Sequence, residues 1–203
     1  AGYRIGILLE EAYIKVGSDL GFYPTDTITA LLYSKERFRD ITRSPAWSGG
    51  IYDGRIKLPA GGIYEKTDEL EKVIFHEYTH AVAHRLSKGR APVWLNEGIA
   101  LHEEGRRSGE YAEYLRGLAE TGEIDLKSLE GSFMGLSPEG AQVAYLLSLS
   151  ATEYIIDEFG IFSVSRIFES LGNGMSLPEA ISGALYLSYD DFERLWKESL
   201  GRR

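Results

Sequence analysis

The chain has 203 residues, of which 43% are hydrophobic and 26% charged, and its formal net charge is -9. These proportions are ordinary for a soluble globular protein, and the length suffices for one large domain or two small ones. The acidic balance excludes a broad surface for nucleic acid or an anionic membrane, because such partners would be repelled. The chain has no cysteine, which excludes disulfides, thiolate metal ligands and a cysteine nucleophile.

The N-terminal segment predicts an amphipathic helix and not a signal peptide, because Glu10 and Glu11 interrupt its apolar core. Its apolar face comprises Ile5, Leu8, Leu9, Ala12, Val16 and Leu20. No apolar run approaches the roughly 18 residues that cross a membrane, so we expect no membrane insertion. Because the first residue is not Met, we expect a processed protein or a piece of a longer one. A secreted or cell-envelope location would fit a processed fragment, but the sequence leaves compartment and oligomeric state open.

Strand signals are confined to the segment before residue 60. Residues 27–33 alternate in polarity and begin with β-branched residues, which predicts a strand, and residues 38–42 are expected to form a short helix. Asp53-Gly54 lies between two short apolar runs. That dipeptide predicts a hairpin with a tight type I′ turn, which requires positive φ at both residues.

The pattern is mostly helical after residue 62. Thr67 is the expected N-cap of a helix that runs to about Lys88, and Pro92 opens another that runs to about Gly105. Further helices are expected over residues 108–121, over 138–159 with Ser137 as N-cap, after the capping box Ser176-x-x-Glu179, and over 189–200.

This order of elements, with strands first and helices afterwards, predicts an α+β fold with a small sheet. We expect one domain over residues 1–203. Its sheet-containing part spans about residues 1–90 and its mostly helical part about residues 91–203.

Three of the four histidines lie in "VIFHEYTHAVAH". On a helix, His76 and His80 lie on one face about 6 Å apart along the axis, so both rings can reach one ion. His84 lies about 12 Å from His76 along the axis. Three histidines at this spacing on a straight helix cannot all bind one zinc ion at about 2.1 Å. Two candidate pairs remain, His76/His80 and His80/His84.

Only the first pair has a glutamate beside its first histidine, Glu77. His-Glu-x-x-His is the metallohydrolase pattern, in which two ligands flank a carboxylate that takes a proton from the attacking water. The alternative is a helix that carries these polar residues by chance. In either case His84 is expected to be a surface or outer-layer residue.

A catalytic zinc site requires a third protein ligand. The metzincin continuation is absent, because Ala83 and Leu86 stand where its glycine and histidine belong. The next predicted helix contains Glu97, and sixteen residues separate it from His80.

"HEYTH" followed by "WLNEGIA" resembles the gluzincin metallopeptidases, and in particular the aminopeptidase-N-like family and the smaller peptidase-MA-like domains. The resemblance is specific over residues 76–104 and loose elsewhere. It implies a zincin-type fold with the hairpin above the active-site helix, and one Zn²⁺ per chain held by His76, His80 and Glu97. The connecting loop is two residues shorter than is usual in aminopeptidase-N relatives.

The resemblance also implies roles outside the ligand set. Glu104 would support a ligand imidazole, and Asn96 would cap the helix or line the site; the alternative for Glu104 is a solvated acidic face. Tyr145 lies in a helix similar to the "A-Y-x-x-S" helix of peptidase-MA-like domains and would donate to the oxyanion; the alternative is a core tyrosine. We expect His102 to serve packing.

The hairpin segment "YDGRIKLP" resembles the edge strand above the active-site helix of these peptidases. That likeness assigns substrate binding to Arg55, Ile56, Lys57 and Leu58, although an ordinary structural hairpin would have the same sequence. The chain lacks the "G-x-M-E-N" segment with which aminopeptidase-N-like enzymes hold a free N-terminus. The prediction is therefore a zinc endopeptidase that acts on peptides or proteins, with Glu77 as general base. Two alternatives stay open: an inactive zincin-fold interaction module, and a metallohydrolase of another substrate.

Overall fold

The computed structural model describes residues 2–42, 50–59, 67–122 and 124–202. Helices predominate, and the strands form one small sheet, in agreement with the expected α+β class. In chain order the elements are α1 (Gly2–Leu20), β1 (Ala30–Tyr33), α2 (Lys35–Thr42), β2 (Ile51–Tyr52), β3 (Ile56–Pro59), α3 (Thr67–Ser87), α4 (Val93–Glu103), η1 (Ser108–Tyr111), α5 (Ala112–Thr121), η2 (Lys127–Leu129), η3 (Phe133–Gly135), α6 (Pro138–Phe159), α7 (Phe162–Gly172), α8 (Leu177–Leu185) and α9 (Tyr189–Leu200).

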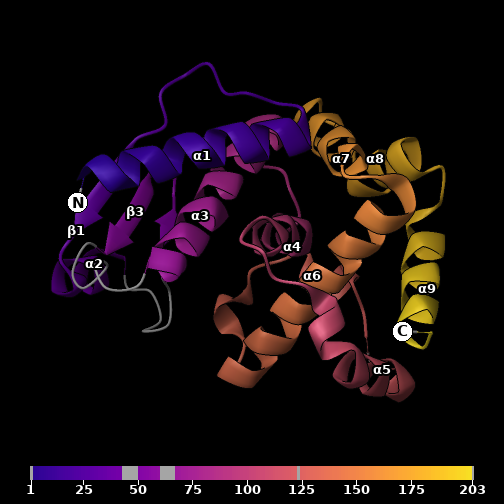
Figure 1. The fold of residues 1–203 in the computed structure, drawn as a ribbon. Coiled ribbons are helices and arrows are strands. Elements are labelled where there is room, and N and C mark those ends of the chain that lie inside the picture. The colour runs from indigo at the N-terminus through magenta and orange to yellow at the C-terminus, as the bar shows by residue number, and fades with distance from the viewer. Residues whose placement is uncertain (1, 43–49, 60–66, 123, 203) are drawn as a thin grey trace.

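The sheet has the strand order β1-β3-β2, with β1 parallel and β2 antiparallel to β3. It lies with α2 near one end of α1, whereas α7 and α8 lie near the other end (Figure 1). β2 and β3 both pack on α3, so the hairpin lies against this helix. Ile56 and Leu58 of β3 are fully buried and join the hydrophobic core.

The hairpin turn differs from the predicted type I′ turn. Tyr52 pairs with Ile56, so three residues connect the strands instead of two. Gly54 has φ +93°, but Asp53 does not have a positive φ. The Asp53 carboxylate accepts a hydrogen bond from Lys57 Nζ at 2.5 Å, which stabilises the wider connection.

Helix α1 packs along α3 through the apolar face that the sequence predicts. Ile5, Leu8, Ala12, Val16 and Leu20 of this face are all buried.

Helices α4 and α6 pack closely against each other at Gly98, which has no room for a side chain. A Cβ atom there would lie 2.3 Å from the Ser148 carbonyl oxygen and 2.1 Å from Thr152 Oγ1. The glycine thus allows α4 to approach α6 closely. This contact fixes the position of α4, which carries Glu97, relative to α6, which carries Tyr145.

Most predicted helix boundaries agree with the structure to within a few residues. Ser137 caps α6 by accepting from the Gly140 amide, and the Ser176/Glu179 capping box is present before α8. Residues 108–121 divide into η1 and α5, and α7 was not predicted. The extension of a single domain to residues 1–203 stays a prediction. Within the described ranges, the model contains no helix with the length and apolarity needed to cross a membrane.

Candidate metal centre

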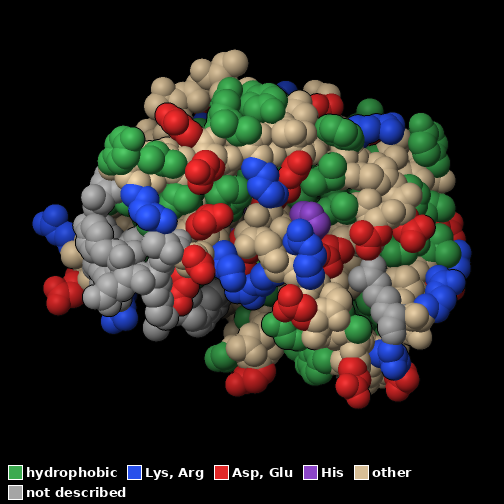
Figure 2. Space-filling model, viewed as in Figure 1, with side chains coloured by type: hydrophobic (Ala, Val, Ile, Leu, Met, Phe, Trp, Pro, Cys, Tyr) green, Lys and Arg blue, Asp and Glu red, His purple; other side chains and the backbone are tan. Residues whose placement is uncertain are grey.

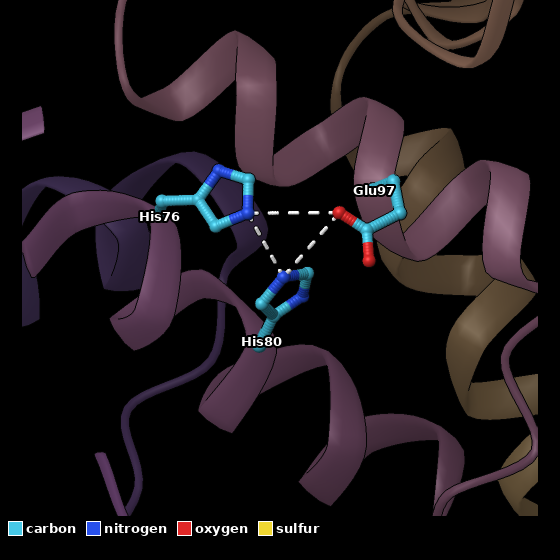
Figure 3. A group of neighbouring side chains, drawn as sticks. All are labelled: His76, His80 and Glu97. Carbon is cyan, nitrogen blue, oxygen red and sulfur yellow. Dashed lines mark hydrogen bonds and ion pairs between the residues drawn. The ribbon is translucent and has the colours of Figure 1, made fainter. Parts of the chain in front are cut away.

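Helices α3 and α4 bring three potential ligand atoms together (Figure 3). His76 Nε2 and His80 Nε2 lie 3.1 Å apart, because four helical residues place their rings on one face. Glu97 Oε2 lies 3.6 Å from each of these nitrogens. Among the described residues, His76, His80 and Glu97 are the group that could hold a metal ion.

The spacing of these atoms fits one zinc ion. Ligands bonded to tetrahedral zinc at about 2.1 Å lie about 3.4 Å from one another. The observed distances of 3.1 and 3.6 Å straddle that value. Three nitrogen and oxygen donors also match the usual ligand set of a catalytic zinc site, which keeps its fourth position open.

The other ring nitrogen of His76 faces a second carboxylate. Nδ1 lies 2.8 Å from Glu104 Oε2, so the two side chains are within ion-pair distance. Glu104 Oε1 in turn lies 2.5 Å from Arg106 Nε. The sequence indicated Glu104 through its position two turns after Glu97, whereas no pattern indicated Arg106.

Charge and burial shape the protonation of the cluster. Burial disfavours the charged form of His76, but Glu104 and Glu97 outweigh it and raise the pKa of His76 to about 10. Burial dominates at His80 and lowers its pKa, although Glu97 and Asn96 act in the opposite direction. Burial opposes ionisation of Glu97, yet the two histidines lower its pKa. These shifts favour a protonated His76, a neutral His80 and an ionised Glu97.

Glu77 lies beside this cluster but does not belong to the ligand group. Its side chain is buried, and burial raises the pKa of Glu77 to about 7. Gly50 packs directly on it: a Cβ atom at Gly50 would lie 2.8 Å from Glu77 Cγ and 2.9 Å from Oε1. A side chain at position 50 would therefore displace the carboxyl group. The sequence analysis missed Gly50, because no local pattern relates it to Glu77.

Tyr145 of α6 lines the same cavity as Glu77 and Glu97. Burial raises the pKa of the Tyr145 phenol, and the nearby Glu97 and Glu77 raise it further, so the hydroxyl keeps its proton. Its ring packs edge-on against Phe133, with 5.4 Å between the ring centroids. The tyrosine thus lines the site with its hydroxyl protonated.

These residues open into a cleft of about 1580 Å³. β2 and α3 form one side, while η1, α5, η3 and the start of α6 contribute the other. Acidic and basic side chains mix across the middle of the molecular face in Figure 2, where a histidine is also exposed to view. The volume exceeds the roughly 300–1,000 Å³ of small-molecule pockets, which favours an extended ligand.

Arg55, Ile56, Lys57 and Leu58 were expected to form a substrate-binding edge, but the strand that carries Ile56, Lys57 and Leu58 is not at an edge of the sheet. β3 lies between β1 and β2, so Ile56 and Lys57 are paired on both sides, and Ile56 and Leu58 are buried. None of the four residues lines the cleft. The strand that does so is β2, with Ile51 and Tyr52, preceded by Gly50.

The remaining histidines lie outside the ligand group. His84 is exposed at the cleft, and its ring packs edge-on against Tyr52 at 5.7 Å between centroids. His102 Nδ1 lies 3.5 Å from Glu153 Oε1 on the other side of α4. Glu153 also accepts hydrogen bonds from Ser108 N and Ser108 Oγ, at 2.8 and 2.5 Å. His102 therefore belongs to a contact that joins α4, η1 and α6.

Comparison with known proteins gives one match. The family model of the peptidase MA superfamily matches residues 9–202. That range includes every residue of the metal-binding group and both sides of the cleft. No curated protein and no solved structure matches the chain.

Proposed function

The chain belongs to the peptidase MA superfamily, and we propose that it is a zinc-dependent metallopeptidase of the gluzincin type. The observation that carries this proposal is the convergence of His76, His80 and Glu97 on one point beside a buried glutamate. A helix with polar residues placed by chance has no reason to meet a third ligand from α4 at 3.6 Å. The family match independently supports peptide hydrolysis.

Zinc held by these three residues would lower the pKa of water to about 7 and polarise the substrate carbonyl. Glu77 supplies the proton transfers: it takes the proton of the attacking water and returns it to the leaving amine. Its raised pKa suits that exchange, because a base near neutrality can both accept and release a proton at physiological pH. Gly50 leaves the space in which the Glu77 carboxyl group sits.

Three further side chains complete the proposed site. Tyr145 donates from its protonated hydroxyl to the oxygen that becomes negative during attack. Glu104 orients His76 through Nδ1. Asn96 lines the cleft beside His80 and helps to position that ring.

We infer endopeptidase action from the form of the cleft. It is large, and the short edge strand β2 offers backbone groups to which an extended chain can add. Glu77 and Glu104 already have roles in the site, and the sequence lacks the "G-x-M-E-N" segment with which aminopeptidase-N-like enzymes hold a free N-terminus.

The test combines metal analysis with cleavage of one internally quenched peptide, prepared with a free and with an acetylated N-terminus. We expect one zinc per chain and equal hydrolysis of both peptides at an internal bond. If acetylation blocks cleavage, the endopeptidase assignment is wrong. If zinc binds stoichiometrically but no peptide is cleaved across a broad library, the inactive interaction module is the better description. Cleavage of a different bond class alone would favour another hydrolase.

A further inference from the structure

Three exposed side chains that are wholly or mainly apolar line the cleft, and the segments that carry them, η1, α5 and η3, are here called its wall. Tyr111 is 47% exposed, Tyr114 52% and Met134 78%, and all three line the cleft. Exposed apolar surface of this kind is unfavourable in water, and its concentration in a groove is typical of a binding site. None of these residues has a role in the proposed proton transfers.

The wall adjoins the proposed catalytic residues. Met134 follows Phe133, whose ring contacts Tyr145 edge-on at 5.4 Å. Tyr111 ends η1 and Tyr114 lies in the first turn of α5. A substrate side chain that contacts Met134 would therefore lie close to the bond that meets Tyr145.

The wall is also held in place before any ligand binds. Ser108, at the start of η1, donates from both its amide and its hydroxyl to the buried Glu153 of α6. This contact fixes the segment that leads to Tyr111 on the helix that carries Tyr145. A preformed wall spares a ligand the entropic cost of ordering it.

The charge of the cleft disfavours acidic ligands. Glu69 and Glu139 line it in addition to the carboxylates of the proposed site. The lysine and arginine side chains that line it, among the described residues, are Lys72 and Arg106, and Arg106 is paired with Glu104. A substrate carboxylate would thus meet an excess of negative charge, whereas an uncharged apolar group would not.

We infer that Tyr111, Tyr114 and Met134 form a side-chain subsite that selects polypeptides with an apolar or aromatic residue next to the cleaved bond. The substrate class is then extended or unfolded protein, because folded proteins bury such residues. Methionine adapts to ligands of different shape, and tyrosine offers a rigid apolar face, so the subsite accepts several apolar side chains. This inference rests on the proposed peptidase function.

The chain's two methionines provide a matched probe. Met134 lies on the wall, whereas Met175 is 51% exposed but does not line the cleft. Both methyl groups can be labelled with ¹³C in the zinc-loaded Glu77→Gln protein and titrated with an uncleaved peptide. A phenylalanine-containing peptide should shift the Met134 methyl resonance and leave that of Met175 in place. The same peptide with serine at that position should have a much weaker effect.

Kinetics give the second measurement. Met134→Ser should lower kcat/KM for the phenylalanine peptide by about tenfold, mainly through KM, because an apolar contact contributes to binding more than to chemistry. Met175→Ser should leave kcat/KM unchanged. If the wild type cleaves the peptide but the Met134 resonance and kcat/KM are unaffected, the subsite is refuted and the peptidase function stands. If no peptide is cleaved, the function fails, and a shift at Met134 alone would still identify an apolar binding wall. If no peptide is cleaved and the Met134 resonance does not shift, both the peptidase function and the subsite are overturned.

Discussion

Helix α3 carries two histidine pairs at the same four-residue spacing, a first pair His76/His80 and a second pair His80/His84. The two pairs have different surroundings. His76 and His80 face Glu97 at 3.6 Å, and His76 also faces Glu104 at 2.8 Å. His84 instead faces the ring of Tyr52 and the backbone of Gly89. The spacing along α3 is identical, so the difference lies in what the neighbouring elements present.

This comparison shows that spacing alone does not make a metal site. Helix geometry places either pair of rings on one face, but only α4 supplies carboxylates, and it supplies them to the first pair. Gly98 has a part in this, because its close approach to α6 sets the position of α4. Substitutions in the two histidine pairs, and in the groups that face the first pair, test this difference.

The largest effect is expected from His76→Ala. Removing one of three ligands leaves two, which is too few for a stable zinc site, so stoichiometric zinc should be lost after dialysis. His84→Ala is the matched control and should retain one zinc per chain by elemental analysis. Loss of zinc in the His84 variant, with retention in the His76 variant, would reverse the assignment of the pair.

Glu77→Gln separates zinc binding from chemistry at the first histidine pair. The three ligands persist, so zinc content should stay at one per chain, whereas turnover should fall by about a thousandfold because the general base is gone. Near-native turnover would remove Glu77 from the mechanism.

The pH dependence of the wild type provides a further check on Glu77. Burial raises the pKa of this carboxyl group to about 7, and a protonated Glu77 cannot accept the proton of water. Activity should therefore fall as the pH decreases through the pKa of Glu77. Zinc, when bound, is a positive charge beside the carboxylate and places that decline at or below pH 7. In the kcat/KM profile of the zinc-loaded enzyme, the decline toward acidic pH should have its midpoint at or below pH 7. A midpoint above pH 8 for this acid-side decline would contradict the assignment.

The parts of the site that could be predicted from the sequence are those with local geometry or a specific motif. His76 and His80 follow from helix periodicity, and Glu97 follows from "WLNEGIA" and no periodicity at all. The edge strand could not be predicted, because the parallel pairing of β1 with β3 joins segments far apart in sequence. That pairing leaves β2 at the edge and makes Ile56 and Leu58 core residues.

Gly50 and Arg106 illustrate a second limit. Each acts through one contact, with Glu77 and with Glu104, which only the tertiary structure creates. Helix α7 escaped prediction for a local reason: only Gly160 and Ile161 separate it from α6. The positive φ of Gly160 ends α6 there and allows the chain to turn. The caps at Ser137 and Ser176 were predicted, because their hydrogen bonds lie within three residues.

Tyr145→Phe tests the hydroxyl group of the α6 tyrosine that lines the cleft with the first histidine pair. Loss of one oxyanion donor should lower kcat by about a hundredfold or more, with little change in KM or zinc content. The phenyl ring preserves the edge-on contact with Phe133. An unchanged kcat would assign Tyr145 to packing alone.

The smallest effect, and the sharpest test of the comparison, is expected from Glu104→Gln. The carboxylates that face α3 are proposed to make the first histidine pair, and not the second, a zinc site. Removing the charge of Glu104, which faces His76 Nδ1, should then weaken zinc binding without abolishing it. Partners of ligand imidazoles typically contribute about tenfold to a hundredfold in metal affinity, and we expect the lower value because glutamine still offers an acceptor oxygen. Competition with a zinc chelator measures the change. Glu139→Gln is the control: it removes the same charge from an exposed residue of the same cleft and should leave zinc affinity unaltered. Equal losses in both variants would mean that overall cleft charge, and not the contact with His76, favours the first pair.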